Sequence, residues 1–237
     1  MMRRLLTPSV LSASLALSLA LACAHDDGPP PRLPDVAAAT FVDGVDNPYF
    51  PLPVGARWVY EAKGEDGTER IEVSVLPETR VVNGVTAVVV RDTVTVNGEV
   101  VEDTWDWYAQ DSEGNVWYLG EDTCEFEAGE CVSKAGAWEW GKEGALPGLV
   151  MPAHPAVDGD RYYQEFKEGE AEDAGEVVAV GLSVTVPAGT YSDCIKTHDT
   201  STLDRDLDEH KYYCAGVGVV KVEEPDATEA LLEVSGI

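Results

Sequence analysis

The sequence predicts an all-β protein in which an antiparallel meander of about ten strands curves into a barrel or half-barrel. Three observations support this class. Segments rich in valine, threonine and aromatic residues alternate apolar with polar positions, short glycine turns separate them, and few segments have the period of an amphipathic helix. A flat sheet of this size would expose two long edges, which curvature into a barrel removes.

The predicted strands follow one another with little sequence between them. Glycine dipeptides at the junctions favour two-residue hairpin turns, because glycine adopts positive φ and the twist of such turns matches that of the strands. These dipeptides are Asp66-Gly67, Asn83-Gly84, Asn97-Gly98 and Glu113-Gly114. The clearest strand segments are 70–78, 85–96, 99–109, 115–122 and 176–186.

The stretch 102–125 combines three tryptophans and two tyrosines with many carboxylates. Alternation along a strand places Trp105 and Trp107 on one face of the sheet, and Asp106 and Tyr108 on the other. We expect most of these aromatic rings to pack in the core and between strands. A platform of exposed tryptophans that stacks on sugar rings is the functional alternative.

The chain begins with a predicted secretory signal peptide, residues 1–22, in which basic residues precede a short apolar stretch and small residues. The sequence Leu-Ala-Leu-Ala-Cys that ends at Cys23 resembles the lipobox of bacterial lipoproteins, in which the cysteine becomes the lipidated first residue. The match departs at Ala20, where the family usually has leucine. Ordinary cleavage of a secreted protein is the alternative. We expect residues 23–40 to form a lipidated, proline-rich tether and residues 41–237 a single β-domain.

Residues 23–237 carry 14 basic and 44 acidic side chains. A field of this sign repels phosphate backbones, so we expect no nucleic-acid partner. Apolar residues make up 44% of the chain, a fraction that supports a folded domain rather than a disordered acidic chain.

Five cysteines leave Cys23 as the unpaired one, and the other four suit an oxidising compartment. Four cysteines allow three connectivities. Nearness in the sequence favours Cys124 with Cys131 and Cys194 with Cys214. Direct opposition of the first pair across a hairpin predicts two further cross-strand pairs, Glu121 with Lys134 and Trp117 with Trp138.

The same reasoning for the second disulfide places His198 directly opposite His210. Two imidazoles on neighbouring strands can bind one transition metal, and Asp206 and Asp208 lie nearby to complete the ligand shell. A divalent metal is therefore the one candidate cofactor. A pair of solvent-exposed histidines is the alternative. The spacing of Asp204, Asp206 and Asp208 resembles the start of an EF-hand, but Glu209 and Ala215 replace the required glycine and glutamate, which favours a solvated acidic turn.

A further candidate cluster, the third acidic cluster, combines one histidine of the long loop 142–160 with acidic residues that follow this loop. We expect it to be a charged sheet edge that discourages aggregation, although a cation site or a pair of carboxylates for acid–base chemistry are alternatives. Its members are His154, Glu165, Glu168, Glu170, Glu172 and Asp173. The chain lacks the serine-elbow, zinc-protease, Walker and dinucleotide-binding motifs.

Three further segments resemble a known group. The segments 184–197 and 209–224, which read VTVPAGTYSDCIKT and EHKYYCAGVGVVKVEE, and the segment 49–61, which reads YFPLPVGARWVYE, resemble uncharacterised β-rich lipoproteins of bacterial envelopes. Some members of that group are similar to open-barrel lipid carriers of the LolA and LppX type. The resemblance implies a concave face that holds an apolar ligand, and it carries over no functional residues.

These observations predict a non-catalytic, lipid-anchored protein of the cell envelope, in the periplasm or at the outer membrane, that binds an apolar or amphipathic ligand such as a lipid. A metal-binding envelope protein that uses the two histidines is one alternative. A carboxylate-dependent hydrolase of an envelope polymer is the other. A carrier requires an apolar cavity, and a hydrolase requires two carboxylates that converge in a cleft.

Overall fold

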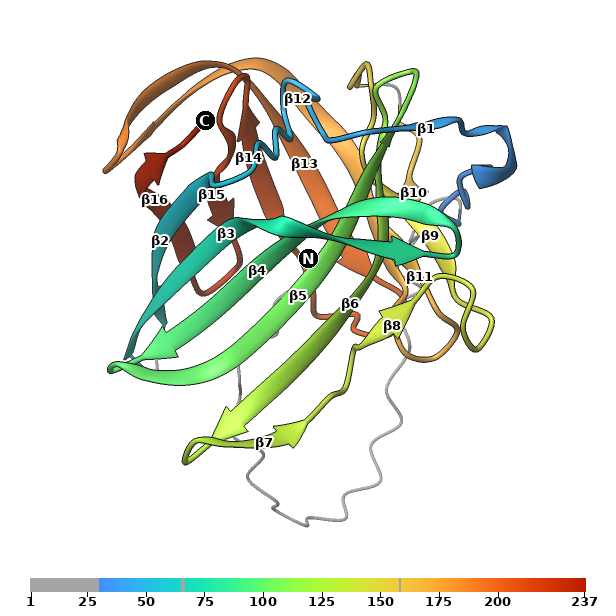
Figure 1. Cartoon of the computed structure of the whole chain (residues 1–237). Helices are drawn as coiled ribbons and strands as arrows, with labels where there is room; N and C mark the ends of the chain where they lie inside the picture. Colours follow the sequence, from blue (N-terminus) through green and yellow to red (C-terminus); the bar gives the residue numbers. More distant parts are fainter. Residues whose placement is uncertain (1–29, 65–66, 158) are drawn as a thin grey trace, which may run out of the picture.

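The computed structural model describes residues 30–64, 67–157 and 159–237. Within them the protein is all-β, as predicted, with 16 strands and one turn of 3-10 helix (Figure 1). The elements are η1 (Val36–Ala38), β1 (Phe41–Val42), β2 (Arg57–Gly64), β3 (Gly67–Val82), β4 (Val85–Val96), β5 (Glu99–Asp111), β6 (Val116–Glu127), β7 (Glu130–Ser133), β8 (Trp138–Glu139), β9 (Leu146–Met151), β10 (Tyr162–Tyr163), β11 (Glu165–Phe166), β12 (Asp173–Val186), β13 (Gly189–Ser201), β14 (His210–Cys214), β15 (Gly218–Glu223) and β16 (Thr228–Ser235).

The strands form one antiparallel sheet in the order β10-β12-β13-β14-β15-β16-β2-β3-β4-β5-β6-β9-β11. The chain enters this order at β2 in the middle, and β16 pairs with β2 to join the two halves. The described strands outnumber the ten expected because several have only two to four residues. Such short strands do not show the alternation that identifies a strand in a sequence.

Two of the predicted two-residue hairpin turns are confirmed, whereas Glu113 and Gly114 lie in a longer connection between Asp111 and Val116. Asn83 and Gly84 have φ values of 45° and 87°, and Asn97 and Gly98 have 53° and 85°. Positive φ at both central residues is the geometry of a type I′ turn, which the Asn-Gly sequence favours. These turns fix β3, β4 and β5 as consecutive neighbours.

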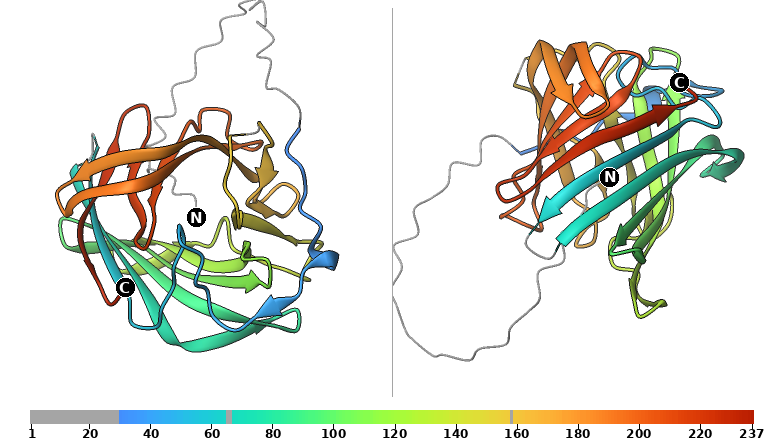
Figure 2. Two further views of the ribbon diagram at one scale, coloured as in Figure 1. Left: turned by 90° about the horizontal axis from the view of Figure 1, so that it is seen from above. Right: turned by 90° about the vertical axis from the view of Figure 1, so that its left-hand side faces the viewer.

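Two very short strands nearly close the barrel. β10 pairs with β12 and β11 pairs with β9, so the segment 162–166 bridges the two edges of the sheet. From above, the strands form a ring (Figure 2). Between the two short strands, the Gln164 amide donates to the Asp173 carbonyl at 2.7 Å. A side chain at Gly148 would place its Cβ within 2.1 Å of the Gln164 backbone, so this crossing requires glycine.

Alternation along the strands produces two apolar clusters, one inside the barrel and one outside. The outer cluster contains Trp107 and Trp117, and the inner one contains Tyr108 and Tyr118. All four are at most 4% exposed, so they are packing residues, as expected, and do not form an exposed sugar platform. Phe41 from the N-terminal segment covers the outer cluster.

Part of the expected tether contacts the domain. The Arg32 amide donates to the Arg161 carbonyl at 2.8 Å, and Val36 packs against the outer apolar cluster. The predicted signal peptide and Cys23 lie outside the described residues. No helix in the described part of the chain has the length and apolar character needed to cross a membrane.

Both disulfides form as predicted. Cys194 and Cys214 are direct partners, with Cα atoms 4.0 Å apart, so the predicted register of β13 and β14 is correct. Cys124 and Cys131 are also bonded, with Cα atoms 5.9 Å apart. Cys131 opposes Phe126 rather than Cys124, however.

The cross-strand pairs derived from direct opposition of Cys124 and Cys131 are therefore wrong. Glu121 lies opposite Trp138, and Trp117 lies opposite Leu149. The hairpin turn pairs Glu127 with Glu130 and Phe126 with Cys131, which already differs from the predicted register, and an irregularity between Glu125 and Phe126 shifts it further. The chain after β7 then contributes two separate short strands instead of one continuous hairpin arm. A disulfide can join diagonal neighbours, so it does not fix the register alone.

We expect Gly148→Ala to open the seam between β9 and β12, because the added methyl group meets the backbone of the bridging segment. Hydrogen–deuterium exchange should show faster exchange of the Gln164 amide. Val81→Ala is the control, since it shortens an exposed side chain on β3 and leaves the backbone of the crossing untouched. Unchanged protection of the Gln164 amide in Gly148→Ala would show that this crossing does not hold the barrel closed.

Candidate functional site

A cavity of about 110 Å³ lies inside the barrel, between the β4–β5 wall and the β14–β15 wall. Its apolar lining includes five aromatic rings, those of Phe50, Trp58, Tyr60, Tyr108 and Tyr213. Its polar lining consists of four carboxylates and one ammonium group, from Asp92, Asp106, Glu209, Glu229 and Lys211. A larger hollow of about 520 Å³ lies beside β2, β16 and the turn after β15, but it is open to solvent and lacks this aromatic lining.

The ammonium group of Lys211 is held between two acids. Lys211 Nζ lies 2.9 Å from Asp199 Oδ2 and 2.8 Å from Glu209 Oε2, and all three residues are buried. Burial lowers the pKa of Lys211, but the charges of Asp199 and Glu209 together outweigh it and raise that pKa well above its usual value. Burial raises the pKa of Glu209. The one buried lysine in the described residues is therefore committed to this triad.

A second buried group joins two carboxyls through a phenol. The Tyr118 hydroxyl lies 2.6 Å from Asp106 Oδ1 and 2.5 Å from Glu121 Oε2. One hydroxyl proton can serve only one carboxylate, so the contact with the other carboxyl requires a second proton. Burial and the charge of Asp106 raise the pKa of Glu121 to about 8. The pair formed by Asp106 and Glu121 therefore shares one proton near neutral pH, in addition to that of the phenol.

The third acidic cluster divides between the interior and the edge of the barrel. Glu165 and Asp173 point inward and are each 7% exposed, so the expectation that they form a charged edge is wrong. The closing segment turns both side chains inward, where Trp138 Nε1 donates to Glu165 Oε2 at 2.9 Å. Burial and the charge of Asp173 raise the pKa of Glu165 well above its usual value. The remaining members are less buried, and His154 in the loop is exposed.

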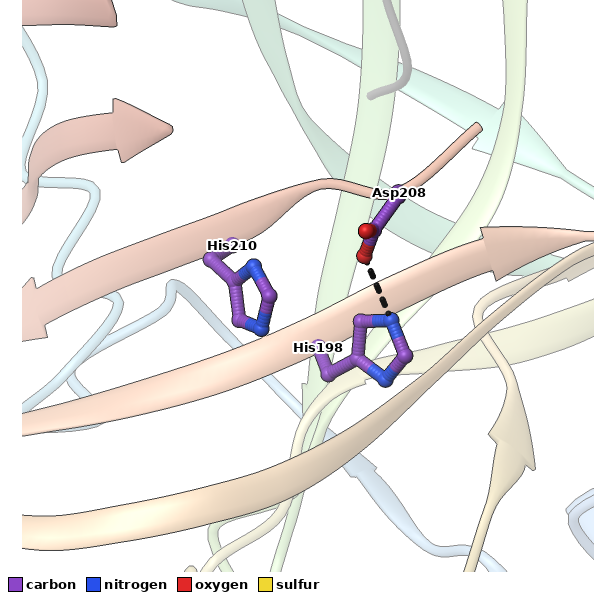
Figure 3. Close-up of side chains that lie close together, drawn as sticks. All are labelled: His198, Asp208 and His210. Carbon is purple, nitrogen blue, oxygen red and sulfur yellow. Dashed lines mark hydrogen bonds and ion pairs between the residues drawn. The ribbon is translucent and has the colours of Figure 1, made fainter. Parts of the chain in front are cut away.

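The predicted histidine pair lies on the opposite face of β13 and β14, outside the barrel. The imidazole rings of His198 and His210 stack with their centroids 4.8 Å apart. Asp208 Oδ1 lies 2.9 Å from His198 Nε2 (Figure 3). The ligand atoms of these three residues are all within 4.8 Å of one another, so the group could hold a metal ion. Asp206, which was expected as a further ligand, is not part of this group; it lies in the turn before β14, where its backbone amide donates to Asp204 Oδ1 at 3.1 Å.

The interior acids and Lys211 are the candidate residues that the sequence analysis missed. Their signal is nevertheless present. Ile195 and Tyr213 face the core, and continuing the alternation by two and four residues leads to Asp199, Glu209 and Lys211. Burial of charged residues in core-facing positions of a strand costs free energy, so such residues are candidates for a functional site.

Comparisons with known proteins give little more. No family profile matches the chain, and no curated protein matches it significantly. A structure described as a putative lipoprotein from Parabacteroides distasonis is similar over 82% of this chain and all of that chain, at 14% identity and a TM-score of 0.43. That similarity is too low to support a fold family or a function, and the resemblance to LolA and LppX carriers stays a prediction.

We expect Lys211→Met to destabilise the protein by about 3–5 kcal/mol, because it leaves two buried carboxylates facing each other without a cation. The free energy of unfolding in urea measures the loss. Lys134→Met is the control, since its pair with Asp122 is exposed and contributes little. Similar losses in both variants would contradict the buried triad.

We expect the protein to be less stable at pH 8 than at pH 5. The pKa of Glu121 is about 8 when folded, against an ordinary 4.5. Its contribution to the free energy of unfolding is therefore fully present below pH 4.5 and is lost as the pH rises through 8. Over that interval the folded state binds more protons than the unfolded state does. The free energy of unfolding, measured in urea at pH 5 and at pH 8, should change less with pH in Glu121→Gln than in the native chain.

Glu168→Gln, which changes an exposed carboxylate, is the control for this measurement. Its pH dependence should equal that of the native chain. An unchanged pH dependence in Glu121→Gln would show that Asp106 and Glu121 do not share a proton near neutral pH.

Proposed function

We propose that this protein is a non-catalytic, lipid-anchored binding protein of the cell envelope. Its barrel holds a small amphipathic molecule that carries a positively charged group. The observation that carries the proposal is the lining of the interior cavity, in which aromatic rings and an excess of carboxylates meet. Aromatic faces and carboxylates together are the groups that recognise organic cations.

The charge balance of the cavity favours a cation over an anion or a neutral molecule. Four carboxylates line it, and its one ammonium group is already shared between Glu209 and Asp199. Glu224, which lies outside this cavity, has its pKa raised to about 7, mainly by burial and further by the charges of Glu209 and Glu229. A bound cation would relieve the repulsion among the carboxylates of the cavity.

The aromatic wall is held in place before any ligand binds. Trp58 Nε1 donates to the Val217 carbonyl at 2.8 Å, and the Tyr60 hydroxyl donates to the Val219 carbonyl at 3.0 Å. Tyr108 stacks on Tyr118, with ring centroids 4.8 Å apart. Rings fixed in this way reduce the ordering entropy that binding costs.

The size of the cavity limits the ligand. The cavity has a volume of about 110 Å³, whereas pockets that enclose drug-sized ligands have volumes of about 300–1,000 Å³. A long acyl chain therefore does not suit this cavity, which is the reason why we propose a small amphipathic molecule in place of the lipid that the carrier resemblance implies.

The proposed anchor rests on the sequence. Lipidation at the lipobox-like Leu-Ala-Leu-Ala-Cys would put a lipid on Cys23, about a dozen residues before Val36, which packs on the barrel. This arrangement would keep the domain close to a membrane surface in the periplasm or at the outer membrane.

A hydrolase is less well supported. It would need two carboxyls that face a substrate together, and the paired carboxyls of Asp106 and Glu121 both contact the Tyr118 hydroxyl. Asp106 lines the cavity, but Glu121 does not. The pair is therefore not presented to a common cleft, and the cavity, although four carboxylates line it, has a volume of about 110 Å³, which is too small for a segment of an envelope polymer.

The proposal is tested with three probes of the same shape and different charge, namely butylammonium, butan-1-ol and butanoate. We expect the indole N–H signal of Trp58 to shift on NMR titration with butylammonium at lower concentrations than with butan-1-ol. Butanoate should leave it unchanged. Asp92→Asn should weaken butylammonium binding by about tenfold or more, because it removes a charged hydrogen-bond acceptor.

Asp122→Asn is the matched control, since it removes an exposed carboxylate on the outer face of β6, and it should bind as the native chain does. If butanoate or butan-1-ol bound as well as butylammonium, or if Asp92→Asn had no effect, the cavity would not be a site for cations.

A further inference from the structure

We infer that His198, His210 and Asp208 form a site for one divalent transition metal of the Zn²⁺ class on the outer face of β13 and β14. This site is separate from the interior cavity and does not depend on the ligand proposed for it. The juxtaposition of two imidazoles and one carboxylate, with a further carboxylate behind one imidazole, carries the inference.

The strand register holds the two imidazoles together. Cys194 pairs with Cys214 at one end of the β13–β14 ladder, and the bridge between Asp199 and Glu209 lies at the other. His198 and His210 lie directly opposite each other next to that bridge. Two histidines in this position need no ordering of a loop to approach each other, so most of the geometry is fixed before a metal arrives.

The surroundings of His198 place a carboxylate oxygen near each ring nitrogen, an arrangement that suits a metal ligand. Its Nε2 faces Asp208 Oδ1 at 2.9 Å, and its Nδ1 faces Glu176 Oε1 at 3.5 Å. A neutral imidazole has one N–H and can donate to only one of these carboxylates. With a metal on Nε2, the proton stays on Nδ1 and is shared with Glu176, while Asp208 becomes a ligand. A carboxylate behind the second ring nitrogen is the usual outer partner of a metal-binding histidine.

His210 supplies the second nitrogen. Its ring stacks on that of His198 with the centroids 4.8 Å apart, and its ligand atom lies within 4.8 Å of those of His198 and Asp208. Lys196 does not compete for the acidic ligands, because it lies 3.7 Å from Glu223 and above the ring of Tyr212. The negative charge of Asp208 and Glu176 therefore remains available to balance a divalent cation.

The distances allow a metal to be reached by side-chain rotation alone. The three ligand atoms lie within 4.8 Å of one another. Ligands of tetrahedral Zn²⁺, at about 2.0–2.1 Å from the metal, lie about 3.4 Å apart. Asp208 is exposed and precedes β14, so its carboxylate can approach the imidazoles from the observed distance to the shorter one without disturbing the strands. Two imidazoles and one carboxylate leave one position for water, a ligand set that suits Zn²⁺ and its neighbours better than Ca²⁺.

Calorimetric titration of the chelator-treated mature chain with ZnCl₂ tests this site. We expect one Zn²⁺ per chain and a rise in Tm with Zn²⁺. Loss of a residue that only hydrogen-bonds a metal ligand weakens metal binding by about 10- to 100-fold. His198→Ala and His210→Ala each remove a ligand, so each should weaken Zn²⁺ binding by more than this. Glu176→Gln should fall within that range. His154→Ala, which removes an exposed histidine elsewhere, should bind as the native chain does.

Thermal unfolding without metal shows whether each variant is folded, so a loss of binding can be assigned to the ligand. Zn²⁺ binding that survives in both His198→Ala and His210→Ala would overturn the proposal. So would the absence of a one-to-one site in the native chain. Equal affinity for CaCl₂ that persists in the histidine variants would assign the binding to the acidic turn instead, and would also overturn it.

Discussion

The register between β13 and β14 is the constraint on which both candidate sites depend. In the observed register, Asp199, Glu209 and Lys211 point into the barrel while His198 and His210 point outward. A shift of one strand by a single residue would exchange its two faces. It would put a histidine into the core and expose the charged triad. The disulfide between Cys194 and Cys214, the ladder beside it and the bridge between Asp199 and Glu209 together oppose that shift, so they place different chemistry on the two faces.

The closing segment places a second set of acids. The two-residue strands β10 and β11 bring Glu165 inward, beside Asp173 at the start of β12. Together with Asp106, Glu121 and the Lys211 triad, these acids give the interior far more carboxyls than ammonium groups. Several carboxyls with raised pKa values relieve part of this charge by keeping protons. The remainder is the physical reason for proposing a cation as the ligand.

Much of this architecture could be predicted from the sequence, because the signals involved are local. Asn-Gly turns identify hairpins, and alternation identifies long strands and their faces. The opposition of His198 and His210 also followed correctly from one disulfide, since the ladder between them has no bulge. The same reasoning gave the wrong register for Cys124 and Cys131, because this disulfide joins diagonal neighbours and the pairing of β6 with β7 is irregular.

Non-local effects explain the other omissions. The strands that close the barrel have two residues each and are defined by their partners, which a single sequence does not show. Asp199, Glu209 and Lys211 could have been assigned to the interior by extending the core-facing alternation from Ile195 and Tyr213. Their polarity favoured a solvent-facing interpretation, and only the three-dimensional pairing of one lysine with two acids stabilises them inside.

Native mass spectrometry of the mature protein, purified gently from its own source without chelator, tests the central claim most directly. Comparison with a denaturing spectrum separates non-covalent ligands from a covalent lipid on Cys23. The account predicts a non-covalent adduct with the mass of a small basic organic molecule. An adduct with the mass of a long-chain lipid or of an organic acid would contradict a barrel interior built for a small cation.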